Sequence, residues 1–575
     1  MAEPNTILDR IRSQFPDAVV ATSTDRGDAT ASVRRETLRD VATFLRDDPE
    51  LRFDMPIDVT AVDYIGQAER FEAVYHLYST AHGHRVRVKA RIPEADPTIA
   101  SLADVWVGAN WLERETYDMY GIRFTGHPDL RRIYLYEEFE GHPLRKDYPK
   151  ERRQPLIGPG NSGKWSPEEE HRYVMELPIA GSEKGMLGAE LMRIQMGPSH
   201  PATHGTVRIV LDLDGETIVG SDVQIGYLHR GFEKECESGF YYQAIPYTDR
   251  LNYSSAILCN VGYCMAVEKL MGVEVTDRCQ WLRVLSGELA RISDHLLCVG
   301  ATCLEMNAFT PFLYNLQARE LVWELINQLC GGRVTSNYVR IGGLSSDMPA
   351  DFPEQLRSRF ERIFQLLGET EQIMIENPIF RERMEGVGKM AKEELIAYGV
   401  TGPLLRAAGV DLDLRRTAPY LVYDQVDFDV PLGTQGDNMD RFLIRIEEMK
   451  QSRRIVEQCL ERMPAGPVDV TDPRVRWPAK GKVFSRMEEL IAQFKNVTEG
   501  PKPEPGEAYC AVESATGEIG YYLVSDGSGK PYKCRARTPS FSNTQPLSRM
   551  VQGGLLADLI PTFDLINMIG GECDR

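Results

Sequence analysis

Apolar and polar positions alternate in short runs through roughly the first 150 residues of the chain. Three β-rich runs predict strands: Ile57 to Tyr64, Phe71 to Ser79 and Arg85 to Ile92. The turn His82-Gly83-His84 between the last two runs favours a hairpin. A helical pattern, Glu36 to Arg46, precedes these strands. The pattern therefore predicts an α+β unit.

A second helix of this unit, Asp104 to Tyr120, is predicted to end at Gly121, because glycine accepts the left-handed backbone of a helix C-cap. Periodicity is then lost in a polar stretch that is rich in glycine and proline. We interpret residues 1–150 as one domain, residues 151–186 as a linker and residues 187–575 as a second domain.

The second domain begins with a strand pair, Val207 to Leu213 and Glu216 to Gln224, joined at the turn Asp214-Gly215. A late hairpin is predicted from Gly520 to Arg537, with its turn at residues 526–529. Most of the remaining domain has apolar positions three or four residues apart, which predicts helices. These are Ser254 to Met271, Arg278 to Gly300, Asn315 to Leu329, Glu354 to Ile375 and Asp440 to Met463. The fold class is thus an α+β domain followed by a mainly α-helical domain with small β-hairpins.

Charge narrows the range of partners. The chain of 575 residues has a formal net charge of −19, which argues against nucleic acid and against free binding to an anionic membrane surface. The longest uncharged window, Leu251 to Val267, contains four polar Asn and Ser residues, so it indicates a buried helix and not a membrane span. We expect a soluble or peripheral protein.

The eleven cysteines all lie at or beyond Cys236, and no Cys-x-x-Cys pair occurs. Their spacing fits neither a zinc site nor an iron–sulfur site, so we expect free buried thiols and no metal held by this chain.

Candidate chemistry begins with the segment from Gly197 to Gly205, which contains His200 and His204. Pro201 disfavours helical geometry at His200, and no Glu follows His200 as a zinc hydrolase requires. A loop or strand-entry imidazole fits better, and a surface or structural role stays open. Tyr253 lies at the N-terminal edge of a long apolar helix, and the pattern alone favours a core aromatic there.

These segments carry a resemblance. Residues Gly197 to Leu270, including Ile225 to Lys234 and Pro246 to Tyr253, resemble the hydrogenase-like large subunit of complex I, the 49 kDa or D subunit. The similarity continues through Arg340-Ile341-Gly342-Gly343 and Arg537 to Phe541 to the terminal Asp574-Arg575. It implies a hydrogenase-large-subunit-like fold for residues 187–575.

The first domain is similar to a different subunit of the same enzyme. Glu113 to Ile122, Gly126 to Arg132 and Gly141 to Pro149 resemble the 30 kDa or C subunit. Some bacteria carry the two subunits as one fused polypeptide. The resemblance thus implies a fused subunit of the proton-translocating respiratory NADH:quinone oxidoreductase, with an N-terminal part that acts as a scaffold.

In this family a quinone enters a chamber beside the terminal iron–sulfur cluster of a partner subunit. The resemblance places the quinone-contacting His at His204 and the Tyr at Tyr253. An imidazole N–H and a phenol O–H can donate to the two quinone oxygens, where negative charge develops on reduction. His200 and Arg250 are expected to support them, and this chain itself binds no redox cofactor.

Three further positions are assigned by the resemblance. Glu305 takes the place of the usual Asp that orients the His, and an ordinary helix-end carboxylate is the alternative. His229 and Arg230 match positions near the partner's cluster, and a structural ion pair of Arg230 with Glu233 or Glu235 is the alternative. Thr335 replaces a His that is thought to couple the potential of that cluster to pH.

Two other functions compete with this interpretation. A group 4 type nickel–iron hydrogenase needs two Cys-x-x-Cys pairs, but Asn252 and Ser255 occupy the first pair of positions and Ile569 and Glu572 the second. A pure assembly scaffold is the other alternative. The resemblance implies as partners the cluster-bearing small (B) subunit, the ferredoxin-like (I) subunit and the quinone-admitting membrane (H) subunit. The expected location is peripheral, on the cytoplasmic side of the bacterial inner membrane.

Overall fold

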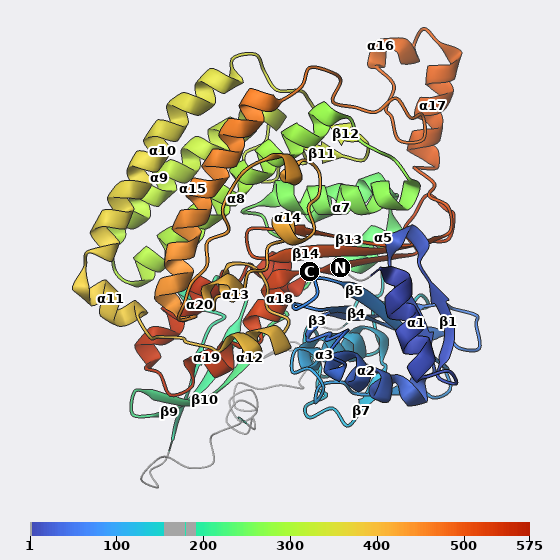
Figure 1. The fold of residues 1–575 in the computed structure, drawn as a ribbon, viewed down its shortest axis with the longest axis horizontal. Helices are drawn as coiled ribbons and strands as arrows, with labels where there is room; N and C mark the ends of the chain where they lie inside the picture. Colours follow the sequence, from blue (N-terminus) through green and yellow to red (C-terminus); the bar gives the residue numbers. More distant parts are fainter. Residues whose placement is uncertain (1–2, 155–178, 180–190) are drawn as a thin grey trace.

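The structure is a computed structural model that describes residues 3–154, 179 and 191–575 (Figure 1). Its N-terminal part is built on a five-stranded sheet in the order β1-β2-β5-β4-β3, in which only β2 and β5 run parallel. The strands are β1 (Val19–Ser23), β2 (Thr30–Val33), β3 (Met55–Asp63), β4 (Phe71–Tyr78) and β5 (Arg85–Ile92). The three predicted strands are therefore confirmed as β3, β4 and β5, and the predicted turn joins β4 to β5.

The predicted helices of this part are α2 (Leu38–Asp47) and α3 (Ala109–Tyr120). Helix α3 begins five residues later than predicted. The Gly108 N–H donates to the Ala397 carbonyl at 2.9 Å, so the chain before α3 bonds to the C-terminal part and does not continue the helix. Gly121 ends α3 at φ +75°, as predicted, and the left-handed backbone there favours glycine.

The predicted linker, residues 151–186, lies almost entirely outside the described residues; only 151–154 and 179 are described. The second part opens with a three-stranded antiparallel sheet in the order β10-β9-β8. Its strands are β8 (Met192–Met196), β9 (Arg208–Asp214) and β10 (Thr217–Gln224), so the predicted strand pair is confirmed. Strand β8 was not predicted, because it is a partly exposed edge strand without a clear alternation.

Five long helices form the body of the second part: α7 (Ala256–Met271), α8 (Asp277–Glu305), α9 (Phe309–Cys330), α10 (Phe352–Ile375) and α15 (Asn438–Arg462). Each of the five predicted helices corresponds to one of them. Figure 1 shows α8, α9, α10 and α15 as a bundle, in which α8 packs against both α9 and α15. Helix α7 is hydrophobic all round, and it packs against a second sheet.

That sheet contains the predicted late hairpin. Strands β14 (Glu518–Ser525) and β15 (Lys533–Arg537) form the hairpin, and β13 (Gly506–Glu513) pairs with the free edge of β14. The α+β region followed by a largely helical region with small antiparallel sheets agrees with the predicted fold class.

The remaining elements are short connections and the C-terminal helices. They are α1 (Pro4–Gln14), β6 (Thr98–Ala100), β7 (Arg123–Thr125), η3 (Pro201–Thr203), α5 (Phe232–Ser238), α6 (Ile245–Thr248), β11 (Val339–Arg340), β12 (Gly343–Leu344), α11 (Pro378–Met384), α12 (Lys392–Ala397), α13 (Pro403–Ala407), α14 (Leu414–Thr417), α16 (Lys480–Val483), α17 (Met487–Thr498), α18 (Pro539–Thr544), α19 (Leu547–Val551), α20 (Leu559–Ile566) and α21 (Gly570–Asp574). None of the helices in the described part of the chain has the length and hydropathy that a bilayer crossing requires.

The two parts share one interior. A hydrophobic core runs from the N-terminal sheet into the second part, where it includes residues of β9, β14 and α20. Arg535 of β15 is completely buried between the parts and forms ion pairs with Asp58 of β3, Glu115 of α3 and Glu233 of α5. The α+β part is thus joined to the helical part by packing and by charge.

Candidate functional site

His204 lies at the entrance to β9, in the loop predicted from the sequence. The short helix η3 ends at His204, whose backbone is left-handed at φ +51°. The imidazole is exposed, and within the described residues only the backbone N–H of His204 is bonded, to the Pro201 carbonyl at 3.2 Å. His204 is therefore presented outward by a short, locally braced loop.

His200 has a local structural role in the same loop. Its Nδ1 accepts a hydrogen bond from the Ala202 N–H at 3.2 Å, which caps η3. The Thr203 hydroxyl donates to the His200 carbonyl at 2.9 Å. These bonds hold the backbone that leads to His204.

Tyr253 lies in the turn between α6 and α7 and is half-buried. Burial and then the negative charge of Asp294 raise the pKa of the Tyr253 phenol, while Arg319 acts in the opposite direction. The phenol accordingly keeps its proton throughout the physiological pH range.

The His204 loop and the Tyr253 turn meet at the C-terminal helix α21. A Cβ atom on Gly570 would lie 2.7 Å from Cγ2 of Thr206, two residues after His204. A Cβ atom on Gly571 would lie 2.4 Å from the carbonyl oxygen of Arg250, three residues before Tyr253. Neighbouring glycines thus contact both segments, although no hydrogen bond joins the two side chains in the described part of the chain.

This close approach gives a first prediction. In Gly571→Ala the added methyl group overlaps the Arg250 carbonyl and must displace the turn that carries Tyr253. If the resemblance holds and the assembled enzyme reduces quinone, we expect that activity to fall about 10²-fold, the scale of a 1 Å misplacement. The control is Gly368→Ala, where the methyl group meets no atom within 4 Å. Equal activities of the two variants would contradict the positioning role of α21.

Arg230 and Arg250 form a second group, on an exposed surface. The Arg230 Nη2 donates to the Arg250 carbonyl at 2.7 Å, and the Arg250 Nη1 donates to the Pro246 carbonyl at 2.7 Å. The alternative ion pair of Arg230 is wrong: Glu233 pairs with Lys533 and Arg535, and Glu235 pairs with Lys150. Burial and then the charge of Arg250 lower the pKa of Arg230.

His229 points in the opposite direction, into the protein. Its ring stacks on Tyr134 at a centroid distance of 4.8 Å, and its Nδ1 lies 2.8 Å from the Asp574 carbonyl oxygen. Burial lowers the pKa of His229, which favours the neutral imidazole. These contacts tie the Arg230 loop to the C-terminal helix.

Glu305 is the last residue of α8 and is partly buried. The described residues contain no hydrogen bond between Glu305 and His204, so an orienting role of Glu305 stays a prediction. Its charge acts instead on Asp564 of α20, whose pKa is raised first by burial and then by Glu305.

Two buried carboxyl groups near this site were missed from the sequence. Asp294 of α8 is fully buried; its Oδ1 accepts from Asn567 at 2.6 Å, while its Oδ2 has no partner among the described residues. Burial raises the pKa of Glu572 of α21 to about 7, and Glu572 accepts hydrogen bonds from Thr516 and Ser540. The polar run Ser293-Asp294-His295 inside an apolar helix was the signal available for Asp294.

The remaining candidates for site chemistry are the cysteines and possible metal ligands. All eleven cysteines are free, and nine are buried, as predicted. Among the described residues, no cluster of three His, Cys, Asp or Glu side chains is arranged to hold a metal ion.

Comparison with known proteins identifies relatives of both parts. Residues 31–154 match the family described as respiratory-chain NADH dehydrogenase, 30 Kd subunit, and residues 305–575 match the corresponding 49 Kd subunit family. The chain is 42% identical to the C/D subunit of NADH-quinone oxidoreductase from Bdellovibrio bacteriovorus, over 96% of this chain and 95% of the relative. It is 38% identical to the C/D subunit from Acidiphilium cryptum, over 100% and 98%. A D subunit of the same enzyme from Sorangium cellulosum is 52% identical over 68% of this chain and 96% of its own length.

Proposed function

The chain belongs to the family of fused C/D subunits of NADH-quinone oxidoreductase, complex I, and from this premise we propose that its second part forms the chamber in which quinone is reduced. The proposal assigns the substrate contacts to His204 and Tyr253. Electrons arrive from an iron–sulfur cluster held by a partner subunit, and their transfer is coupled to proton translocation.

One observation carries this proposal: the His204 loop and the Tyr253 turn, 49 positions apart in the sequence, both pack on α21, at Gly570 and Gly571. The two side chains supply different proton donors. His204 offers an imidazole N–H, whereas the Tyr253 phenol has a raised pKa and holds its proton until an acceptor gains negative charge. The pair fits a substrate ring with two oxygens that each gain a proton on two-electron reduction.

Asp294 supports Tyr253 in this proposal. The charge of its buried carboxylate is the second cause, after burial, of the raised phenol pKa. Glu305 keeps the proposed role of orienting carboxylate for His204, and His200 braces the loop that leads to His204.

The exposed pair Arg230 and Arg250 is assigned to the surface that faces the partner's cluster. Two cations whose described hydrogen-bond acceptors are carbonyl groups retain their positive charge. Such charge stabilises the reduced cluster and raises its potential. The partners proposed for the chain are the cluster-bearing B subunit, the ferredoxin-like I subunit and the quinone-admitting H subunit. The proposed location is peripheral, on the cytoplasmic face of the inner membrane.

The N-terminal part is proposed to be a scaffold. Its buried carboxylates Asp58 and Glu115 bind Arg535 of the second part, which fixes one part to the other. The test of the quinone chamber is the quinone-reductase activity of assembled complexes that carry His204→Ala or Tyr253→Phe. If both variants keep full activity, the proposed chamber is wrong and the whole chain acts as a scaffold.

A second prediction concerns Thr335, which is exposed in the turn after α9. Threonine cannot exchange a proton near neutral pH, so we expect the potential of the partner's cluster to change with pH much less than about 59 mV per pH unit, the slope for one proton per electron. Redox titrations of the assembled enzyme at several pH values measure this slope. Thr335→His is expected to steepen it, and a steep slope in the unaltered enzyme would refute the prediction.

A further inference from the structure

The segment that contains α16 and α17 exposes an unusual amount of apolar surface. Figure 1 shows both helices at the edge of the molecule, away from the bundle. Phe484, between them, is 89% exposed. Five further apolar residues of α17 are between 47% and 67% exposed: Met487, Leu490, Ile491, Phe494 and Val497.

These five residues lie on one face of α17, because they are separated by steps of three, one, three and three positions. The opposite face is polar and is bonded to the protein. The Asn496 Nδ2 donates to the Arg476 carbonyl at 3.0 Å, and Glu489 forms an ion pair with Arg476 at 3.4 Å. Helix α17 therefore has the reverse of the usual orientation, with its apolar stripe facing away from the chain. A contiguous exposed stripe of this kind marks an interaction site.

The charge of the segment points to the nature of its partner. Between residues 474 and 498 the sequence has six basic residues and two acidic ones, although the whole chain has a net charge of −19. Lys480, Lys482, Arg486 and Lys495 are exposed around the stripe. A complementary surface is therefore apolar in the middle and acidic at its rim.

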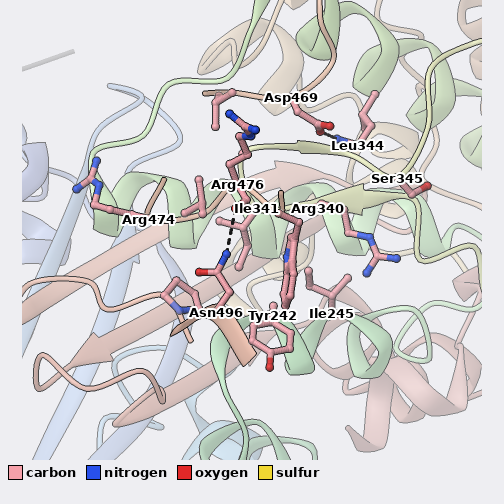
Figure 2. A pocket seen from close by; sticks show the side chains of 15 residues that line it. Tyr242, Ile245, Arg340, Ile341, Leu344, Ser345, Asp469, Arg474, Arg476 and Asn496 are labelled. Atoms are coloured by element: carbon pink, nitrogen blue, oxygen red, sulfur yellow. Dashed lines mark hydrogen bonds between the residues drawn. The ribbon is translucent and has the colours of Figure 1, made fainter. Parts of the chain in front are cut away.

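A cavity of about 410 Å³ (Figure 2) touches α17 through Asn496, on the face opposite the stripe. Its lining includes Trp477, whose ring packs edge-on against Tyr242 at 5.4 Å, and Asn496 of α17. Arg340 also lines the cavity, and no carboxylate among the described residues forms an ion pair with its guanidinium. The cavity thus has an aromatic wall and a cation, and it lies on the side of α17 that faces the protein.

We propose that the face formed by Trp477, Phe484 and the apolar stripe of α17 docks against another subunit of the same enzyme. That subunit presents an apolar surface rimmed by carboxylates, which meet the exposed cations Lys480, Lys482, Arg486 and Lys495. A second copy of this chain fits poorly, because a symmetric contact would bring identical basic rims together. An anionic membrane also fits poorly, because the net charge of −19 repels it. The inference requires only membership of the multisubunit enzyme and not the quinone chamber.

The test measures access to this face in the purified enzyme. In Phe494→Cys, the rate of reaction with a water-soluble maleimide is compared between the assembled enzyme and the full chain alone. We expect at least tenfold protection in the assembled enzyme. Ile379→Cys, on α11 and 70% exposed, is the matched control and is expected to react equally fast in both samples.

A short bifunctional reagent attached at position 494 then identifies the occupant. Cross-linking to a different subunit supports the proposal. Cross-linking to a second copy of this chain, protection that appears only with anionic vesicles, or no protection in the assembled enzyme would each overturn it.

A paired substitution tests the contribution of the stripe to assembly. The double variant Ile491→Gln and Phe494→Gln is expected to dissociate from the purified enzyme at least tenfold faster than the unaltered chain. Its unfolding temperature as an isolated chain is expected to stay the same, because both side chains are already exposed. Ile379→Gln is the control, and equal dissociation rates of the two variants would refute the proposal.

Discussion

Quinone-reductase turnover of the assembled enzyme is expected to fall about 10²–10⁴-fold in His204→Ala, the range typical for loss of one positioned proton donor. The imidazole is exposed on a braced loop, so its removal leaves no buried cavity. The loss should therefore appear in turnover and not in the stability of the chain.

Tyr253→Phe is expected to lower turnover about 10²–10³-fold, as does removal of one hydrogen-bond donor to a developing oxyanion. The ring and its packing are retained, because only the hydroxyl is lost. The double variant should be little slower than the slower single variant if both residues act on one substrate molecule.

The measurement is NADH:quinone activity of purified complexes, accompanied by NADH oxidation with an artificial electron acceptor. The second activity, and the spectroscopic signals of the clusters, should be unchanged in both variants. The controls are His82→Ala and Tyr136→Phe, two exposed positions of the N-terminal part. Loss of cluster signals in His204→Ala or Tyr253→Phe would assign the defect to assembly, and full activity would contradict the proposed chamber.

Arg535→Met is expected to reduce the free energy of unfolding of the chain by about 3–5 kcal/mol, the cost of breaking a buried ion pair. Arg535 lies 2.6 Å from Asp58 and 3.0 Å from Glu233, and it also pairs with Glu115. All four side chains are buried, so its loss leaves three carboxylates with insufficient positive charge. The network spans both parts of the chain, and the variant should therefore loosen the contact between them.

Denaturant unfolding of the full chain measures this effect. The control is Arg381→Met, which removes an exposed ion pair with Glu385 four residues away and should cost about 0.3–0.5 kcal/mol. Equal losses in the two variants would mean that the buried network contributes no more than a surface pair.

The same network sets a pH dependence. Burial acts to raise the pKa of Asp58, but the charge of Arg535 outweighs it and lowers the pKa to about 2. Because the pKa is lower in the folded state, the stabilisation is present above about pH 3.9, the value for an unfolded chain, and is lost as the pH falls towards about 2. The variant Arg535→Met lacks the cation that lowers the pKa, so burial favours the protonated form of these carboxyl groups. Mild acidification from neutral pH should therefore increase the stability of the variant.

Local patterns were sufficient for much of the fold. Strands β3, β4 and β5 are runs rich in β-forming residues, and the five long helices have apolar residues at helical spacing, so both are visible in the local sequence. Strands β8 and β13 were missed because β8 is a partly exposed edge strand and β13 shows no simple alternation. The start of α3 was misplaced because Gly108 bonds to Ala397, a partner that no local pattern reveals.

The candidate site, too, could be predicted only in part from the sequence. Residue types and their resemblance to a family selected His204, Tyr253, Arg230 and Glu305, and placed a loop at His204. The sequence did not reveal that Glu233 pairs with Lys533 and Arg535, which excludes it as the partner of Arg230. Nor did it reveal Asp294, because a single carboxyl group within a helix becomes informative only when its burial is known.

By itself, then, the sequence determined the family, the order of the two parts and the position of the five long helices and seven of the strands, because these depend on residue type and short-range periodicity. Only the tertiary structure decided that α21 contacts both the His204 loop and the Tyr253 turn, and that Arg535 meets Asp58 across 477 positions of sequence. Contacts at such separations arise from how whole elements pack. Each contact joins two distant segments, and the sequence of one segment does not reveal which residues of the other it will contact.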